Sequence, residues 1–307
     1  MLGKEVRQFL ILTMTFTIPL RKVKGPTPIA LDYVWTVLPP LVEKASVFYN
    51  QRPTNRTQPI LGENAYASAA IILTAISIES YANTIFYYEN VQPGNDIPKE
   101  LSEILHTNQP SLPQDYLKAL LDEVYVLRNV IAPGHLYETE FRLGQNIKAP
   151  ARTMSLEPRL GKANPRWKNS VNIVTRRTRK LGLNIRPVLI SFEDLLKILI
   201  MFDLTLAVSA NAFRGMYTLP PFSLQVSDFA PENLSSLLAC CYCQIRSQDL
   251  INRIDSLAEK LRKRFAQFTP PNGREYCFIT NQCPNCLTLG FRKQNKPCTC
   301  VKCGKTC

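Results

Sequence analysis

Residues 63–89 form a long apolar stretch that restricts the fold of this chain more than any other feature. Its apolar side chains recur at positions that cover most of the circumference of an α-helix. These side chains are Ile71, Ile72, Leu73, Ile76, Ile78, Tyr81 and Ile85. Because a helix that is apolar on nearly all sides must be covered by neighbouring elements, we expect it at the centre of a helical bundle.

Other stretches show the three- and four-residue apolar spacing of helices, namely residues 29–49, 114–131, 191–213 and 248–268. Pro39-Pro40 predicts a bend in the first of these helices, and Pro133-Gly134 predicts the end of the second. Ser191 and Asp194 are spaced like a helix-capping pair. Residues 93–113 contain several prolines and indicate a connection. We therefore predict a mainly α fold.

The sequence pattern divides the chain into four parts. They are an N-terminal segment (1–27) with the alternation of an edge strand, a helical domain (28–218), a connector with an amphipathic basic helix (219–274), and a cysteine-rich tail (275–307). No stretch reaches the ~20 uncharged apolar residues of a membrane span. The apolar run near the N-terminus lacks the small-residue cleavage site of a signal peptide. We therefore expect a cytoplasmic protein without a membrane partner.

The formal charge of +13 is concentrated in an insertion within the helical domain. Residues 142–186 contain twelve basic residues and one acid, so their net charge is +11. A basic block of this kind is typical of a polyanion partner, and we predict a nucleic acid. A solvated loop or a contact to an anionic membrane surface are the alternatives. The residues predicted to bind RNA are Arg152, Arg166, Trp167 (by stacking on a base), Lys168, Arg176, Arg177, Arg179 and Lys180.

All ten cysteines lie after residue 239, and two Cys-x-x-Cys pairs stand near the end of the chain. Four thiolates at this spacing fit a structural, tetrahedral Zn²⁺ site without an open catalytic position. A redox-active or disulfide-bonded cluster is the alternative, and a further cysteine can replace a ligand of the second pair. The predicted ligands are Cys283, Cys286, Cys300 and Cys303, and the spare cysteines of the tail are Cys277, Cys298 and Cys307.

The pair Arg128 and His135 is the main candidate for chemistry. The chain has only two histidines, so any proton transfer by imidazole near neutral pH must use His106 or His135. His135 follows the helix that carries Arg128, which places a cation near a titratable base. Glu79 lies in the apolar helix 63–89 and needs a partner if it is buried, and Arg128 is the natural candidate.

The helix pattern, together with Ser77-Ile78-Glu79 and the Arg128-Asn129…His135 motif, resembles the HEPN superfamily, and the cysteine-rich tail resembles a zinc ribbon. The resemblance implies a helical bundle at residues 28–218. It also implies a homodimeric, metal-independent RNA endonuclease with Arg128, Asn129, His135 and Glu79 at its site. Members of this superfamily often act as toxins or in defence against phage. In many members the histidine stands five positions after the arginine, where this chain has Pro133.

That departure sustains an alternative, a non-catalytic nucleic-acid-binding or scaffold protein that uses the bundle to dimerise. In a third reading, the chain is a regulatory module whose zinc ribbon and basic helix 248–268 dock a protein partner. If the chain is catalytic, neutral His135 would take the proton of the RNA 2′-OH as general base, or protonated His135 would give a proton to the leaving 5′ oxygen as general acid. Arg128 would hold the phosphate as charge develops, Asn129 would orient it, and the products would be a 2′,3′-cyclic phosphate and a 5′-OH.

Overall fold

The structure is a computed structural model that describes residues 29–53, 58–132, 138–142, 151–155, 165–213 and 245–268. Within these residues it is mainly helical, as predicted. The α-helices are α1 (Ile29–Asn50), α2 (Leu61–Tyr88), α3 (Ile97–Asn108), α4 (Gln114–Ile131), α5 (Pro165–Ser170), α6 (Phe192–Ala212) and α8 (Gln248–Phe265). The short 3-10 helices are η1 (Pro187–Leu189) and η2 (Ala266–Phe268). The strands are β1 (Glu138–Arg142), β2 (Ala151–Ser155), β3 (Val171–Asn172) and β4 (Arg177–Thr178).

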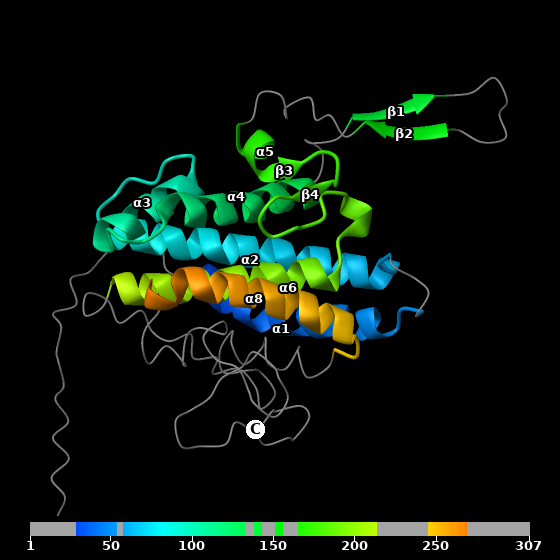
Figure 1. The fold of residues 1–307 in the computed structure, drawn as a ribbon, viewed down its shortest axis with the longest axis horizontal. Helices are drawn as coiled ribbons and strands as arrows, with labels where there is room; N and C mark the ends of the chain where they lie inside the picture. Colours follow the sequence, from blue (N-terminus) through cyan, green and yellow to red (C-terminus); the bar gives the residue numbers. More distant parts are fainter. Residues whose placement is uncertain are drawn as a thin grey trace, which may run out of the picture.

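Helix α2 is the central element of the bundle, as its sequence predicts. It lies between α4 on one side and α1 and α6 on the other (Figure 1), and it packs against all three. Ala70, Ile71, Ala75 and Ile78 are fully buried. By length and composition alone, residues 61–87 could also cross a membrane, but 56% of the most apolar part is buried inside the bundle.

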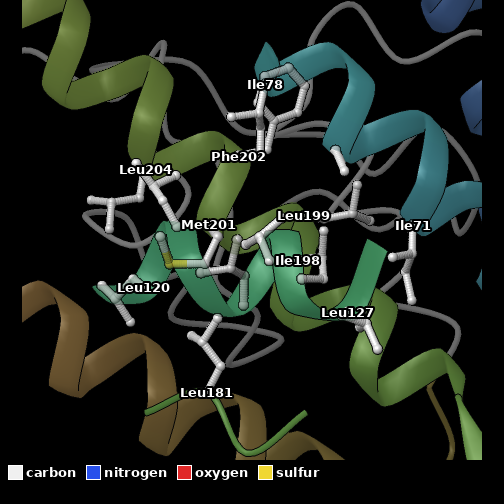
Figure 2. Close-up of a cluster of buried hydrophobic side chains, with 14 of the residues drawn as sticks. Ile71, Ile78, Leu120, Leu127, Leu181, Ile198, Leu199, Met201, Phe202 and Leu204 are labelled. Atoms are coloured by element: carbon white, nitrogen blue, oxygen red, sulfur yellow. The ribbon is translucent and has the colours of Figure 1, made fainter. Parts of the chain in front are cut away.

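The core is built from side chains that lie far apart in the sequence. Figure 2 shows one cluster in which α2, α4, α6 and the turn after β4 meet. Its labelled members are Ile71, Ile78, Leu120, Leu127, Leu181, Ile198, Leu199, Met201, Phe202 and Leu204. Burying one such side chain contributes roughly 1.5–3 kcal/mol of hydrophobic stabilisation, so this cluster sets how the helices that carry the candidate site are placed.

Helix α6 begins where the capping pair predicts. The Ser191 hydroxyl accepts the Asp194 N–H at 3.4 Å, and the Asp194 carboxylate accepts the Ser191 N–H at 3.0 Å. The same carboxylate accepts the backbone N–H of Asn184 at 2.9 Å. Burial raises the pKa of Asp194, although these hydrogen bonds oppose the rise. One side chain thus joins the start of α6 to the segment that precedes it.

Helix α3 contradicts the prediction of a connection at residues 93–113. The Asp96 carboxylate accepts the Lys99 N–H at 3.2 Å, and Glu100 accepts the Gly94 N–H at 2.8 Å. Leu101 and Leu105 are fully buried. The prolines that suggested a connection flank the helix or, like Pro98, occupy its first turn, where a missing N–H removes no helical hydrogen bond.

Helix α8 packs on α6 and belongs to the same core. Its apolar side chains repeat at three- and four-residue spacing, as expected, and they are buried. On the rim, Arg253 forms an ion pair of 2.9 Å with Glu193 of α6. The buried side chains are Leu250, Ile254, Ala258, Leu261 and Phe265. The predicted N-terminal segment 1–27, residues 219–244 of the connector and the tail 275–307 lie outside the described residues.

The second half of the basic insertion forms an ordered layer on α4. Strand β3 pairs antiparallel with β4, with Val171 opposite Thr178. The Glu123 carboxylate of α4 accepts the N–H groups of Lys180 and Leu181, each at 2.7 Å. Glu123 is 1% exposed, and burial raises its pKa against the effect of these two bonds. In the first half of the insertion, β1 pairs antiparallel with β2.

Candidate functional site

Arg128 and Glu79 form an ion pair between the last turn of α4 and the middle of α2. The Arg128 Nη1 atom lies 3.2 Å from Glu79 Oε2, and the two side chains are 33% and 34% exposed. The expected pairing is therefore present, but it lies at the edge of the bundle rather than in its core. A phosphate that approaches Arg128 can reach the guanidinium, and it would compete with Glu79 for it.

Tyr125, one turn before Arg128, lies between two guanidinium groups. The guanidinium carbons of Arg128 and Arg166 each lie 5.6 Å from the centre of its ring. The Tyr125 hydroxyl is buried and has no hydrogen-bond partner among the described residues. Burial raises the pKa of Tyr125, and the charge of Glu79 adds to the rise. The phenol therefore stays protonated at neutral pH.

Arg166 is held in place by two carboxylates. It lies 2.6 Å from Asp96 at the start of α3 and 2.8 Å from Asp122 of α4, and its side chain is 19% exposed. Asp122 also pairs with Lys118 at 2.6 Å. Although the sequence suggested an RNA contact, the structure gives Arg166 the geometry of a clamp that fixes α5 to α3 and α4.

The other predicted catalytic residues lie at and beyond the end of α4. The helix ends at Ile131, as predicted, and Ala132 is already extended. Asn129 is exposed on the last turn, next to Arg128. Pro133 and His135 lie outside the described residues. The structure thus brings Arg128 and Asn129 of α4 together with Glu79 of α2 at the C-terminal end of α4. His135 follows the last residue of α4, Ile131, by four positions in the sequence.

His106, the other histidine, is a structural residue. Its Nδ1 atom lies 3.1 Å from the carbonyl oxygen of Leu112, so it bridges the end of α3 and the loop before α4. His106 therefore lies in the last turn of α3, and its partner is a backbone oxygen.

The residues predicted to bind RNA differ in how exposed their side chains are. Trp167 is 5% exposed and packs in the core, so its ring offers no face to a base. The physical reason is that α5 is a single short helix that needs an apolar anchor on the bundle. The exposed members are Lys168, Arg177 and Arg179, and the half-exposed members are Arg176 and Lys180. Arg152 lies in β2, and its side chain is outside the described residues.

Two tyrosines of α4 are central to the charged surface, and sequence reasoning missed both. Tyr125 organises the Arg128 cluster, and Tyr116 lies beneath Lys180 and Arg264, whose charged groups are each 4.6 Å from its ring centre. The spacing of Tyr125 and Arg128, three residues on one helix, is a local signal that indicates a contact. The partners of Tyr116 come from distant segments and give no such signal.

The predicted zinc ligands Cys283, Cys286, Cys300 and Cys303 lie outside the described residues. Among the residues that the structure describes, no group of three or more histidine, cysteine, aspartate or glutamate side chains is arranged to hold a metal ion. The zinc site therefore stays a prediction from the spacing of the cysteines.

Comparisons of the chain with models of protein families, with curated proteins and with solved structures found no match.

Proposed function

We propose that this chain is a metal-independent RNA endonuclease similar to HEPN ribonucleases. The observation that supports the proposal is that the Arg128 guanidinium, although paired with Glu79, stays 33% exposed at the end of α4. Asn129 is exposed beside it, and His135 follows seven residues after Arg128 in the sequence.

The proposed reaction uses the nucleophile that RNA carries. The 2′-OH attacks the adjacent phosphorus and loses its proton to His135, and the bond to the 5′ oxygen breaks as that oxygen gains a proton. Arg128 stabilises the charge on the phosphate oxygens, and Asn129 orients the group. The products are a 2′,3′-cyclic phosphate and a 5′-OH, and no catalytic metal ion takes part.

We also propose roles for the basic residues, the dimer and the zinc ribbon around this site. Exposed Lys168, Arg177 and Arg179 hold the RNA backbone. A two-fold homodimer places two Arg128–His135 pairs in one groove. The zinc ribbon docks RNA or a protein partner, and the protein works in the cytoplasm as a toxin or an antiviral effector.

The test is cleavage of labelled tRNA, mRNA and single-stranded DNA by the purified full-length protein in EDTA. We expect cleavage of RNA only, because DNA lacks the 2′-OH. The variant His135→Ala should lose this cleavage, whereas the matched variant His106→Ala should keep it. Cleavage of DNA, or equal cleavage by both histidine variants, would contradict the proposal.

A non-catalytic RNA-binding protein is the second candidate, and two observations favour it. Glu79 neutralises Arg128, and Pro133 stands at the position where many HEPN members have their histidine. On this proposal the His135→Ala variant binds RNA as the wild type does, and neither protein cleaves it.

The structural zinc site has a separate test. The full-length protein should carry one zinc ion per chain, bound by Cys283, Cys286, Cys300 and Cys303. Cys283→Ser should lower the zinc content, whereas Cys240→Ser, outside the two Cys-x-x-Cys pairs, should not. Zinc content that is the same in both variants would exclude this set of ligands.

A further inference from the structure

A pocket that is separate from the Arg128 cluster lies where the C-terminal half of α8 meets the first turn of α4. Its volume is about 560 Å³, within the range of small-molecule sites. It is lined by Tyr116, Ser256, Glu259, Lys260, Lys263 and Arg264. Phe265, behind Tyr116 with its ring centre 6.0 Å away, anchors this wall in the core.

Tyr116 contacts two cations, Arg264 of the pocket lining and Lys180, which is not part of the lining. The Lys180 Nζ atom and the Arg264 guanidinium carbon each lie 4.6 Å from the centre of its ring. Cation–π contacts of this kind contribute roughly 0.5–1 kcal/mol each at exposed sites, enough to favour one orientation of a long side chain. The backbone of Lys180 is fixed separately, because its N–H is held by Glu123. Both cations are therefore positioned before any ligand arrives.

The positive charge of the pocket is poorly neutralised. Lys180, Lys260 and Arg264 form no ion pair with any described residue. Lys263 has Glu259 at 3.7 Å, with both side chains largely exposed, a geometry that contributes little. The Glu123 carboxylate interacts with the charge of Lys180, but its two oxygens are occupied by backbone N–H groups. Several like charges are thus gathered around one cavity, which attracts an anion.

We propose that this pocket binds the phosphate groups of a phosphate ester, and we name it the Tyr116 pocket. Lysine and arginine side chains are the usual partners of phosphate oxygens, and an arginine can hold two of them at once. The ester is either a phosphodiester of an RNA backbone or the phosphate chain of a free nucleotide. The RNA source rests on the proposed function, whereas the nucleotide source does not.

The Tyr116 pocket is distinct from the Arg128 cluster. Tyr116 and Arg128 are twelve residues apart on α4, which is about 18 Å along a helix with a rise of 1.5 Å per residue. No residue that lines the pocket belongs to the pairs around Arg128. A ligand in the pocket therefore adds a contact away from the proposed cleavage site.

The experiment measures the binding of two probes to the full-length protein. One probe is a fluorescein-labelled oligouridylate RNA of about a dozen nucleotides, a length within the usual site size of single-strand binders, and the other is ATP. The test variant is Lys260→Ala with Arg264→Ala. The matched control is Lys44→Ala with Lys99→Ala, which removes two exposed lysines from α1 and α3. Thermal unfolding confirms that both variants fold.

We expect the test variant to bind one probe about tenfold more weakly or worse, and the control to bind within about twofold of the wild type. For RNA, the slope of log Kd against log salt concentration should also decrease by about 1.4, because two phosphate contacts to a single strand are lost. A loss for RNA without ATP binding identifies a nucleic-acid backbone, and a loss for ATP identifies a nucleotide. Equal binding by the test and control variants, for both probes, would overturn the proposal.

The same measurements separate this inference from the proposed function. If the wild type binds RNA through Lys260 and Arg264 but cleaves nothing, the pocket stands and the nuclease proposal fails. If His135→Ala abolishes cleavage while the Lys260→Ala, Arg264→Ala variant binds both probes like the control, the nuclease proposal stands and the pocket fails.

Discussion

Helix α4 carries two tyrosines that are each flanked by two cations, and their surroundings differ in charge balance. At Tyr125 the cations are Arg128 and Arg166, with ring distances of 5.6 Å. At Tyr116 they are Lys180 and Arg264, with ring distances of 4.6 Å. Each ring has two cations nearby, yet among the described residues only the cations of the first cluster form ion pairs with carboxylates.

The acidic partners decide what each tyrosine cluster can do. Glu79, Asp96 and Asp122 pair with the arginines around Tyr125, so that cluster ties α2, α3, α4 and α5 together and leaves only Arg128 partly accessible. Around Tyr116, Lys180 and Arg264 form no ion pair with a described residue, and Arg264 lines the pocket beside Lys260, Lys263 and Glu259. The carboxylates therefore give the Tyr125 cluster a structural role, whereas the cations around Tyr116 are the ones that we propose to bind an anion.

The largest expected effect concerns Arg128, the one cation of the Tyr125 cluster that we assign to chemistry. Arg128→Ala should lower the rate of RNA cleavage by about 100- to 1000-fold, as the loss of one stabilising donor at the transition state does. The rate is measured in single-turnover assays. Arg253→Ala, which also removes an ion-paired arginine, is the matched control. A rate within a few-fold of the wild type would place Arg128 with the structural arginines.

The next effect concerns the anchor of Lys180. Glu123→Ala leaves two backbone N–H groups without an acceptor and should lower the free energy of unfolding by about 2–3 kcal/mol. It should also weaken RNA binding at the Tyr116 pocket, while the ion pairs around Tyr125 remain. Denaturant unfolding and hydrogen exchange of residues 171–185 measure the change. Unaltered exchange there would mean that Glu123 does not hold this layer.

Glu79→Gln tests the comparison directly, because it removes an acidic partner from the Tyr125 cluster. We expect RNA affinity to rise about two- to fivefold and the salt slope to increase by about 0.7, since Arg128 gains freedom to contact a phosphate. Glu103→Gln, which removes the exposed partner of Lys99 in α3, is the control for lost negative charge. Equal affinity in the two variants would show that net charge alone, and not Arg128, governs binding.

The smallest expected effect at neutral pH is that of Tyr125→Phe. The Tyr125 hydroxyl has no partner among the described residues, so its removal should change the free energy of unfolding by less than about 1 kcal/mol. Burial raises the pKa of folded Tyr125 above the ordinary value of 10.0.

Because burial raises the pKa of Tyr125, this residue makes the free energy of unfolding depend on pH in the alkaline range. Above pH 10.0 the unfolded chain releases the Tyr125 proton while the folded chain keeps it, so stability is full below this pH and falls as the pH rises through the folded pKa. Tyr125→Phe should reduce this alkaline loss, to which buried Tyr81, whose pKa burial also raises, contributes as well, whereas Tyr116→Phe should leave the contribution of Tyr125 intact. Unfolding curves recorded from pH 8 to pH 11 measure the difference, and identical alkaline curves for the two variants would contradict the assignment.

Features that depend on neighbouring residues were predictable from the sequence. The range of α4 and the capping pair at Ser191 follow from local spacing, and so does the central place of α2. The pairing of Arg128 with Glu79 is the one tertiary contact that was predicted, although the argument from burial does not hold, because Glu79 is 34% exposed.

Features that depend on tertiary contacts were not predictable. Trp167 looked like a stacking residue because it stands among basic residues, but only the packing of α5 on the bundle shows that it is buried. Arg166 looked free because Asp96 and Asp122 are distant in the sequence. The Tyr116 pocket was invisible for the same reason. Composition reports the charge of a segment but not which of its charges are already paired.

The arrangement at Tyr116 also bears on heat stability. Tyr116, Lys180 and Arg264 belong to three segments that only the folded chain brings together. An anion that needs all three binds the folded state and not the unfolded chain, so it shifts the folding equilibrium by RT ln(1 + [L]/Kd). If the Tyr116 pocket binds a phosphate ester as we propose, the melting temperature of the protein should rise with the concentration of that ester.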